Sequence, residues 1–337
     1  MRSWVGDRSG LQTRPVVITG CSGFVGANLA IAVAARGARV IGVETSSGID
    51  WRTRDVPGLE LVRLDLCQKQ DVAAFVERVQ PLAIYNCAAY GAYSVQADPA
   101  RIFDVNLLAV RHLLEAVRGV RGFQAFVQAG SSSEYGYNCS APREDAATEP
   151  DSDYAVSKVA ATQLVRMYAQ KYDVPGFVLR LYSVFGPYED FSRLIPSLLG
   201  HAREGRFPPL VNPNISRDFV YVSDAVRAFE AVLAHAPQLR KGEVFNVGSG
   251  VRTTLGELVQ LVRELFGIHA EPAWGSMPDR SWDHPAWFAD ASKAASALDW
   301  RSSVSLRDGL AATARWIEDH PALVAEGRAK TVLELKR

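Results

Sequence analysis

The sequence is poor in cysteine and carries no excess charge of either sign, and both features exclude whole classes of protein. The four cysteines, at positions 21, 67, 87 and 139, form no CxxC pair, so neither a disulfide framework nor a zinc site is indicated. Lysine and arginine together number 37, as do aspartate and glutamate, so no overall charge attracts nucleic acid or an acidic membrane. We therefore expect reduced thiols in a cytoplasmic protein, with any anionic ligand held at a local site.

Long apolar runs and histidine clusters are missing as well. The longest apolar run, around Phe24–Ala35, contains Asn28 and is too short to cross a bilayer. Residues 1–14 are polar and lack the apolar centre of a signal peptide. His201, His235, His269 and His284 show no ligand spacing. We expect neither a membrane segment nor a bound metal.

Short apolar segments alternate with helical ones through the first half of the 337 residues. Strands are predicted at 16–19, 38–44, 61–65, 82–86, 123–129 and 177–182, and helices at 23–36, 71–79, 99–118 and 153–172. This alternation predicts an α/β fold of the Rossmann type, with a doubly wound parallel sheet covered on both faces. Such a sheet binds its ligands at the carboxyl ends of its strands, where the strand order reverses.

After Gly186 the pattern loosens into helices separated by short strands and proline-rich turns. The helices are predicted at 193–204, 224–234, 254–266, 291–298 and 306–319. We read this half as a smaller C-terminal α/β lid that interleaves with the sheet. The predicted organisation is an N-terminal extension (1–14), the sheet domain (15–186, with returning segments near 217–250), a region that is mostly lid (187–320) and a C-terminal tail (321–337).

A glycine-rich loop, Gly20-Cys-Ser-Gly23-Phe-Val-Gly26, joins the first strand to the first helix. Glycines let the backbone approach a pyrophosphate, and the amino end of the helix supplies N–H donors and a positive dipole. The spacing GxxGxxG would also suit a simple tight turn, but its place after an apolar strand favours a dinucleotide. The candidate contacts are Gly20, Ser22, Gly23, Phe24, Val25 and Gly26.

Acidic residues close the next two predicted strands. Glu44 can accept both ribose hydroxyls of an adenosine and would repel a 2′-phosphate, which favours NAD over NADP. Arg52 and Arg54 in the following loop could still cover such a phosphate, so NADP stays open. At Asp65-Leu66 a carboxylate could meet the adenine amine and a leucine its face.

Tyr154 and Lys158 open a predicted helix and share one of its faces. An ammonium group beside a phenol favours the phenolate, and such a tyrosine can exchange a proton with a hydroxyl as hydride leaves the adjacent carbon. A solvated helix face is the plain alternative. Because about four βα units separate the pair from the glycine loop, both can meet at one cleft.

Three serines lie in the run Gly130-Ser-Ser-Ser-Glu-Tyr-Gly136, at the carboxyl end of the fifth predicted strand. They can donate hydrogen bonds to one carbonyl or hydroxyl and so fix its orientation. The alternative is a serine turn, which is common after strands.

Taken together, these motifs resemble the extended short-chain dehydrogenases/reductases, in particular the NAD-dependent nucleotide-sugar epimerase/dehydratase family. The resemblance covers about residues 15–320. It also includes Asn86-Cys-Ala-Ala89, Asn106, Arg217–Val222, Phe245–Gly248 and the stretch 287–293. It implies NAD as the cofactor, a nucleotide-diphosphate sugar as the substrate, and a homodimer in which helices 99–118 and 153–172 pair across the axis.

The resemblance also implies roles for single residues. Tyr154 would be the general acid/base, Lys158 its partner and a ribose ligand, and Ser131 the catalytic serine. Further implied cofactor contacts are Ala88, Ala89 and Asn106, and implied substrate contacts are Ser132, Ser133, Arg193, Arg217 and Arg280. Arg217 and Arg280 suit a diphosphate because a guanidinium can bind it through two bonds, although a surface ion pair is the alternative for each.

One departure from the family pattern reduces the number of reactions that we expect. Ser133 stands where the 4,6-dehydratases carry a glutamate, and Glu134 comes one position later, where it would point differently. We therefore expect an epimerase acting at C4 of a nucleotide-linked hexose, with an NAD(P)H-dependent reductase of 4-keto-6-deoxyhexoses as the close alternative. A reductase of non-nucleotide substrates and a non-catalytic NAD-binding protein are less favoured. Cys21 and Cys87 are expected to serve packing near the cofactor.

Overall fold

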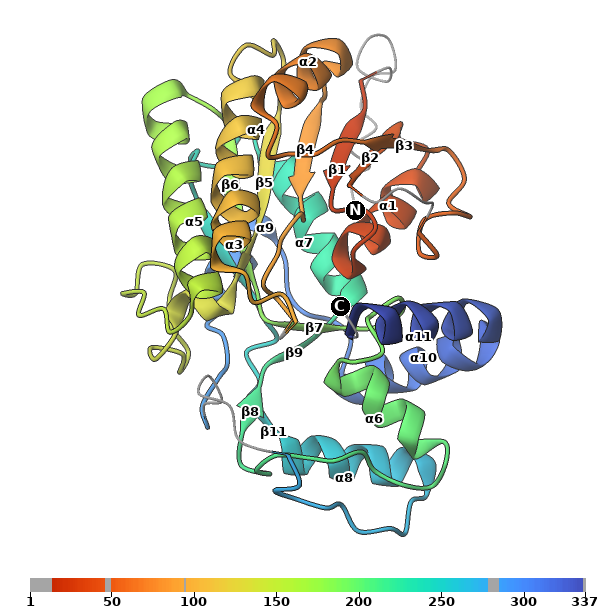
Figure 1. Ribbon diagram of the computed structural model, residues 1–337. Coiled ribbons are helices and arrows are strands. Elements are labelled where there is room, and N and C mark those ends of the chain that lie inside the picture. The colour runs from red at the N-terminus through yellow and green to blue at the C-terminus, as the bar shows by residue number, and fades with distance from the viewer. Residues whose placement is uncertain (1–13, 46–49, 94, 278–284, 336–337) are drawn as a thin grey trace.

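The fold is built on a parallel sheet of seven strands in the order β10-β6-β5-β4-β1-β2-β3 (Figure 1). The computed structural model describes residues 14–45, 50–93, 95–277 and 285–335. The strands are β1 (Val16–Thr19), β2 (Val40–Glu44), β3 (Leu59–Arg63), β4 (Ala83–Asn86), β5 (Ala125–Ser131), β6 (Gly176–Leu181) and β10 (Val244–Val247).

Helices cover both faces of this sheet, as the alternation in the sequence predicts (Figure 1). One face packs on α1 (Phe24–Ala35), α7 (Val222–His235) and α9 (Ser292–Leu298). The other packs on α2 (Lys69–Val79), α4 (Ala109–Val117) and α5 (Asp153–Tyr172). Val16 and Ile18 belong to the first core and Val17 to the second, which is why three successive positions of β1 are apolar.

Two predicted strands are displaced by two residues, β3 toward the N-terminus and β5 toward the C-terminus. Strand β3 lies at the edge of the sheet and is only partly buried, so its hydrophobic pattern marks its ends poorly; its pairing with β2 sets the register. Strand β5 continues through Gly130 to Ser131 because both residues pair with β6. As a result the serine run begins inside the sheet.

The predicted helix over 99–118 is one continuous helical stretch with an irregular centre. It consists of α3 (Pro99–Phe103), a π-helical turn over Asp104–Leu108, and α4. A π turn adds one residue locally, which a 3.6-residue hydrophobic period does not reveal. The turn contains Asn106, which is 1% exposed.

A second, smaller core lies beyond the carboxyl ends of the strands. It is formed by α6 (Leu194–Ala202), α8 (Leu255–Phe266) and α10 (Leu306–Asp319), close to the predicted helix bounds. Two short strand pairs lie beside it, β7 (Ser183–Phe185) with β9 (Phe219–Tyr221), and β8 (Ser216–Arg217) with β11 (Thr253–Thr254). Figure 1 shows these elements below the sheet.

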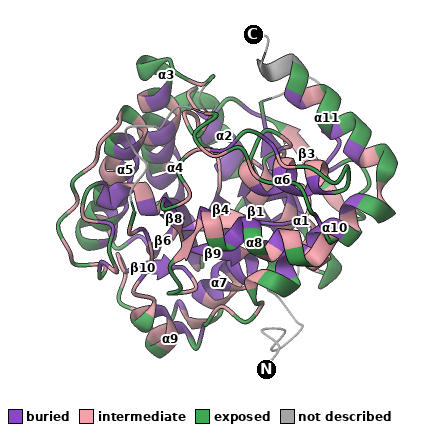
Figure 2. Cartoon of the chain, turned by 90° about the horizontal axis from the view of Figure 1, so that it is seen from below, coloured by how far each residue is buried: buried purple, intermediate pink, exposed green. Residues whose placement is uncertain are grey.

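The segment that the sequence marks as a C-terminal tail forms a helix, α11 (Pro321–Leu335). Its buried face consists of Val324, Gly327 and Thr331, and most of its other described residues are exposed or half-buried (Figure 2). Val324 is the one large apolar side chain of that face, so the sequence shows no periodic row of apolar residues that would predict a helix. Among the described residues, no helix combines the length and the apolar character needed to cross a membrane.

Candidate active site

The carboxyl ends of β1 and β4 meet where the strand order reverses. Strand β1 lies between β4 and β2, and Gly20 follows it with a φ of +65°. A Cβ atom on Gly20 would lie 2.7 Å from the backbone nitrogen of Ala88, just beyond β4. This is the crevice in which an open α/β sheet binds its ligand, and it brings the predicted contacts Ala88 and Ala89 next to the glycine loop.

The glycine loop closes tightly on itself before α1 begins. The N–H of Gly23 donates to the carbonyl of Gly20 at 2.9 Å, and a Cβ atom on Gly26 would lie 2.2 Å from that same oxygen. Gly23 precedes α1 without a side-chain cap, and the first turn of α1 has no acidic residue. The backbone N–H groups at this helix end therefore suit a pyrophosphate, and the cradle fits the dinucleotide implied by the sequence.

Glu44, 8% exposed, ends β2 beside this loop. The two arginines that could have covered a 2′-phosphate are held by protein groups. Arg52 donates to the carbonyls of Ser22 and Tyr188, at 3.2 and 2.8 Å, and Arg54 forms an ion pair with Glu326. This arrangement leaves the carboxylate of Glu44 suited to ribose hydroxyls and so favours NAD.

Asp65 and Leu66 follow β3 after a gap of one residue. Asp65 is exposed, and hydrogen bonds from the N–H of Cys67 and the amide of Gln68 lower its pKa. Leu66 is buried in the core beneath α2 and α4. An adenine contact through these two residues stays a prediction.

Tyr154 and Lys158 lie in the first turns of α5, at the same edge of the sheet. The side chain of Ser152 caps the helix by accepting from the N–H of Ala155. Lys158 is 3% exposed, donates to the carbonyl of Ala129 at 2.6 Å, and lies 5.8 Å from the centre of the Tyr154 ring. Tyr154 is half-buried, so its ring is not enclosed in the core.

The amide of Asn106 is bonded entirely within the protein. It accepts from the N–H of Tyr90 at 2.9 Å and donates to the carbonyl of Tyr90 and the hydroxyl of Ser157 at 2.8 and 2.9 Å. The π turn thus ties the loop after β4 to the first turns of α5. The structure gives Asn106 the geometry of a residue that positions its neighbours, and its predicted contact with the cofactor stays a prediction.

Ser131 ends β5 and caps the short 3₁₀ helix Ser132–Tyr135. Its hydroxyl lies 2.6 Å from that of Ser133, so the two hydroxyls share a hydrogen bond. Its N–H donates to Glu134. Two of the predicted substrate contacts, Ser132 and Ser133, therefore lie next to the predicted catalytic serine.

Glu134 points into the core and away from the crevice. It is fully buried, and its second carboxylate oxygen accepts from Arg180 at 2.9 Å and from the hydroxyl of Thr162 at 2.8 Å. The guanidinium of Arg180 also lies 4.4 Å from the centre of the Tyr135 ring. With both oxygens occupied in this way, Glu134 cannot serve as the acid of a dehydratase.

The structure describes two of the three arginines predicted to contact substrate. Arg193 precedes α6 and donates to the carbonyl of Ala92 at 3.1 Å, in the loop that follows β4. Arg217 lies in β8 with its guanidinium 5.1 Å from the centre of the Trp287 ring. Arg280 lies outside the described residues. Arg193 thus links the lid to the wall of the crevice.

The thiols near the glycine loop are not nucleophiles at neutral pH. Burial raises the pKa of both Cys21 and Cys87 to about 12. A Cβ atom on Gly42 would lie 2.7 Å from the sulfur of Cys21, so this thiol fills the space above a glycine in β2. Among the described residues, no group of three or more His, Cys, Asp and Glu side chains could hold a metal ion.

One set of site residues is not evident from the sequence. A buried polar chain crosses three strands: Thr19 donates to Asn86, Asn86 donates to Gln128 at 2.7 Å, and Gln128 donates to the carbonyl of Ala129 at 3.1 Å. Lys158 bonds to that same carbonyl. Polar residues inside apolar strands were the available signal, and only the strand pairing shows that they line up.

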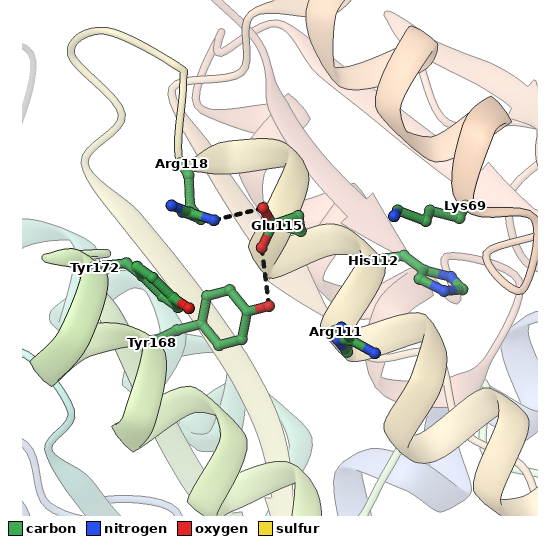
Figure 3. Close-up of a pocket in the computed structure, with 7 residues that line it drawn as sticks. All are labelled: Lys69, Arg111, His112, Glu115, Arg118, Tyr168 and Tyr172. Atoms are coloured by element: carbon green, nitrogen blue, oxygen red, sulfur yellow. Dashed lines mark hydrogen bonds and ion pairs between the residues drawn. The ribbon is translucent and has the colours of Figure 1, made fainter.

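A cavity of about 290 Å³ lies elsewhere, on the outer side of α4 and α5 (Figure 3). Arg111, His112 and Glu115 line it from α4, and Tyr168 and Tyr172 from α5. The hydroxyl of Tyr168 donates to Glu115 at 3.0 Å. Tyr168 comes 14 residues after Tyr154, which is about 21 Å along a helix. This cavity is therefore separate from the crevice.

Comparison with known proteins agrees with this geometry. The model of the NAD-dependent epimerase/dehydratase family matches residues 16–248. A Bacillus subtilis protein named as an uncharacterized UDP-glucose epimerase, YtcB, is 29% identical over 88% of this chain and 95% of its own. A dTDP-glucose 4,6-dehydratase of Xanthomonas campestris pv. campestris is 27% identical, over 89% and 92%. The structure of the epimerase Mth375 of Methanothermobacter thermautotrophicus superposes with a TM-score of 0.83 at 27% identity, covering 94% and 95%.

Proposed function

Because the chain belongs to the NAD-dependent epimerase/dehydratase family, we propose that it is a nucleotide-sugar oxidoreductase acting at C4 of a hexose, and specifically a 4-epimerase. One observation carries the proposal. Tyr154, Lys158 and Ser131 lie at the sheet edge that also presents the glycine loop, while Glu134, the nearest carboxylate to the serine run, is locked into the core. The site therefore has the groups for proton exchange at an alcohol, while the serine run, all of it described, presents no carboxylate to the crevice for dehydration.

The cofactor is NAD, and the crevice has the groups to hold it. The turn from Gly20 to Gly26 and the amino end of α1 would take the pyrophosphate, Glu44 the adenosine ribose, and Lys158 the second ribose. When bound, NAD supplies a nicotinamide carbon that accepts hydride from the sugar and gives it back. All other steps fall to side chains of this chain.

Tyr154 is the proton-transfer group of the proposed reaction. Its phenolate oxygen takes the proton of the C4 hydroxyl while C4 is oxidised, and returns that proton when C4 is reduced. The ammonium of Lys158, held on Ala129, lies 5.8 Å from the centre of the Tyr154 ring and places a positive charge beside the phenol. Ser131 donates a hydrogen bond to the C4 oxygen, which keeps the reacting carbon in place while the sugar presents its other face.

The substrate is a nucleotide-diphosphate sugar. The two named relatives act, by their names, on UDP-glucose and dTDP-glucose, which supports this class. We propose the lid, mostly residues 187–320, as the part that holds the nucleotide. Arg193 and Arg217 reach out from it, and their guanidinium groups suit a diphosphate.

The close alternative is a reductase of 4-keto-6-deoxysugars, which the serine run also resembles. An epimerase keeps its NAD and returns the hydride to the same sugar, whereas a reductase consumes NAD(P)H at every turnover. The two differ in what must be added to the purified protein.

The test starts from the protein as purified, with its NAD content measured after extraction. UDP-glucose, UDP-galactose and dTDP-glucose are then offered without added cofactor, and the sugars are separated by chromatography. We expect bound NAD and interconversion of C4 epimers. Turnover of a 4-keto-6-deoxysugar only with added NAD(P)H would show a reductase, and a 4-keto product that absorbs in alkali would show a dehydratase.

A homodimer through α4 and α5 is part of the proposal. Leu108 in the π turn and Val156 and Met167 in α5 are large apolar side chains that are 39–42% exposed on this side of the molecule. Met167→Glu together with Leu108→Glu should shift the sedimentation of the protein to the monomer, whereas Val251→Glu, at an exposed valine elsewhere, should not. A wild type that sediments only as a monomer would contradict the dimer.

We also propose a cytoplasmic location, because four free cysteines suit a reducing compartment.

A further inference from the structure

The glycine loop is connected to the last helix of the chain through Arg52. This side chain is 6% exposed, and it donates from Nη1 to the carbonyl of Ser22 at 3.2 Å and from Nε to that of Tyr188 at 2.8 Å. Its guanidinium also lies 4.4 Å from the centre of the Trp51 ring. Arg52 thus supports the glycine loop through a hydrogen bond to the backbone of Ser22, a residue that is predicted to contact the cofactor.

Asp50 continues the connection to α11. One of its oxygens accepts from the N–H of Arg52 at 3.0 Å and lies 3.6 Å from its Nη1, while the other forms an ion pair with Lys330 of α11. The Asp50 side chain is 2% exposed. A buried ion pair between Arg52 and Asp50 and a half-exposed one between Asp50 and Lys330, whose side chain is 38% exposed, therefore connect Ser22 to α11.

Ring packing holds the same segment against α11. Trp51 is 3% exposed, and a Cβ atom on Gly327 of α11 would lie 2.9 Å from its ring. The centres of the Tyr188 and Phe191 rings lie 5.8 and 6.3 Å from that of Trp51. The helix can approach this closely because residue 327 is glycine.

We propose that Arg52 is a positioning residue for the glycine loop, and that α11 is the latch that keeps it in place and so slows the release of NAD. The physical reason is that the Arg52 guanidinium must stay buried against the Ser22 carbonyl. Asp50 neutralises the charge of this guanidinium, and Lys330 in turn holds Asp50 in place. The inference rests on the proposed function in one respect: slow release matters most to an enzyme that reuses one NAD in every turnover.

The test measures the release of the reduced cofactor directly. The full-length protein is loaded with NADH, mixed with a large excess of NAD, and followed by the loss of bound-NADH fluorescence. We expect Lys330→Met and Arg52→Met to release NADH about three to thirty times faster than wild type, the range in which residues along a coupling network act. The conservative variant Lys330→Arg should restore slow release.

The matched control is Glu326→Gln, also on α11. It breaks the ion pair between Glu326 and Arg54, whose side chains are 47% and 37% exposed, and leaves the connection through Arg52, Asp50 and Lys330 intact. It should release NADH at the wild-type rate. Thermal unfolding of each variant without cofactor and the KM for sugar at saturating NAD separate the latch from a general loss of stability. Both should stay near wild type in Lys330→Met, because Asp50 keeps its pairing with Arg52, whereas Arg52→Met is expected to lower stability as well.

The outcomes are distinct. Folded Lys330→Met and Arg52→Met proteins that release NADH at the wild-type rate would overturn the proposal. So would a Glu326→Gln variant that accelerates release equally, since the connection through Arg52, Asp50 and Lys330 would then have no special role. If the variants release NADH faster while no sugar is epimerised, the latch stands and the proposed function fails.

Discussion

Lys158 donates a hydrogen bond of 2.6 Å to the carbonyl of Ala129, and this bond joins the start of α5 to the end of β5. The two residues are 29 positions apart in the chain. The same carbonyl accepts from Gln128, the last member of the polar chain that crosses β1, β4 and β5. The ammonium group is thereby fixed near Tyr154 by the sheet itself.

Replacing the phenol should abolish proton exchange and leave the fold intact. Tyr154→Phe is expected to lower kcat by about 10²- to 10⁴-fold, the usual contribution of a general acid/base. NAD content, measured after extraction, should stay at the wild-type level. Tyr172→Phe, on the same helix but 18 residues further along, is the control and should keep its activity. Unchanged turnover in Tyr154→Phe would favour a protein that binds NAD without catalysis.

Closing the cradle should weaken cofactor binding. In Gly26→Ala the new Cβ atom would lie 2.2 Å from the carbonyl oxygen of Gly20, so the loop must move. Overpacking of this kind costs about 1–3 kcal/mol, which corresponds to roughly 5- to 150-fold in the Kd for NAD. Gly119→Ala meets no neighbouring atom within 4 Å and should bind NAD normally in the same titration. Equal affinity in both variants would show that the loop is not the pyrophosphate cradle.

Removing Arg180 should destabilise the fold strongly. Arg180→Met leaves the buried carboxylate of Glu134 without its counter-charge, and breaking one partner of a buried pair costs about 3–5 kcal/mol. The free energy of unfolding in urea measures this loss. The double variant Arg180→Met/Glu134→Leu should recover part of it because no unpaired charge remains. A loss below about 1 kcal/mol in the single variant would mean that Glu134 has another source of stabilisation.

Stability should also depend on pH through Glu189. Burial raises the pKa of Glu189 to about 8, with Arg193 opposing the shift, and its Oε2 has no hydrogen-bond partner among the described residues. The folded protein therefore keeps this carboxyl protonated where the unfolded chain ionises it, so the stabilisation is present at low pH and is lost as pH rises through about 8.

The corresponding experiment compares wild type with Glu189→Gln, which resembles the protonated form. Between about pH 6 and pH 9 the wild type should lose roughly 2 to 3 kcal/mol of unfolding free energy relative to this variant. Glu77→Gln, at an exposed glutamate, should follow the wild type. Parallel stability curves for wild type and Glu189→Gln would show that Glu189 is ionised in the folded protein.

The sequence predicted the central elements best because burial on both faces leaves a strong pattern. Strand β1 and the helices α1 and α5 fall within one residue of their predicted bounds. Strand β3 was displaced because an edge strand is half-exposed, and the π turn was missed because it changes the helical period over one turn. Helix α11 gave no signal because its contact face is built around a glycine.

For the candidate site, the sequence indicated how one carboxylate is oriented. That Glu134 would face away from the crevice followed from its place one residue after Ser133, and the structure shows it in the core. What the sequence could not show are partners distant in the chain. Asn106 bonds to Tyr90 and Ser157, and Arg52 to Ser22 and Tyr188, through contacts that exist only once the sheet and lid are assembled.

The ion pair between Asp50 and Lys330 has a consequence for how the protein matures, because its members are 280 residues apart. At a translation rate of about 5–20 residues per second, roughly 15–60 s separate the synthesis of the two. A nascent chain would hold its first βαβ unit long before the last helix leaves the ribosome. Durable loading with the dinucleotide would then be a late event, completed only after α11 has been synthesised and has docked.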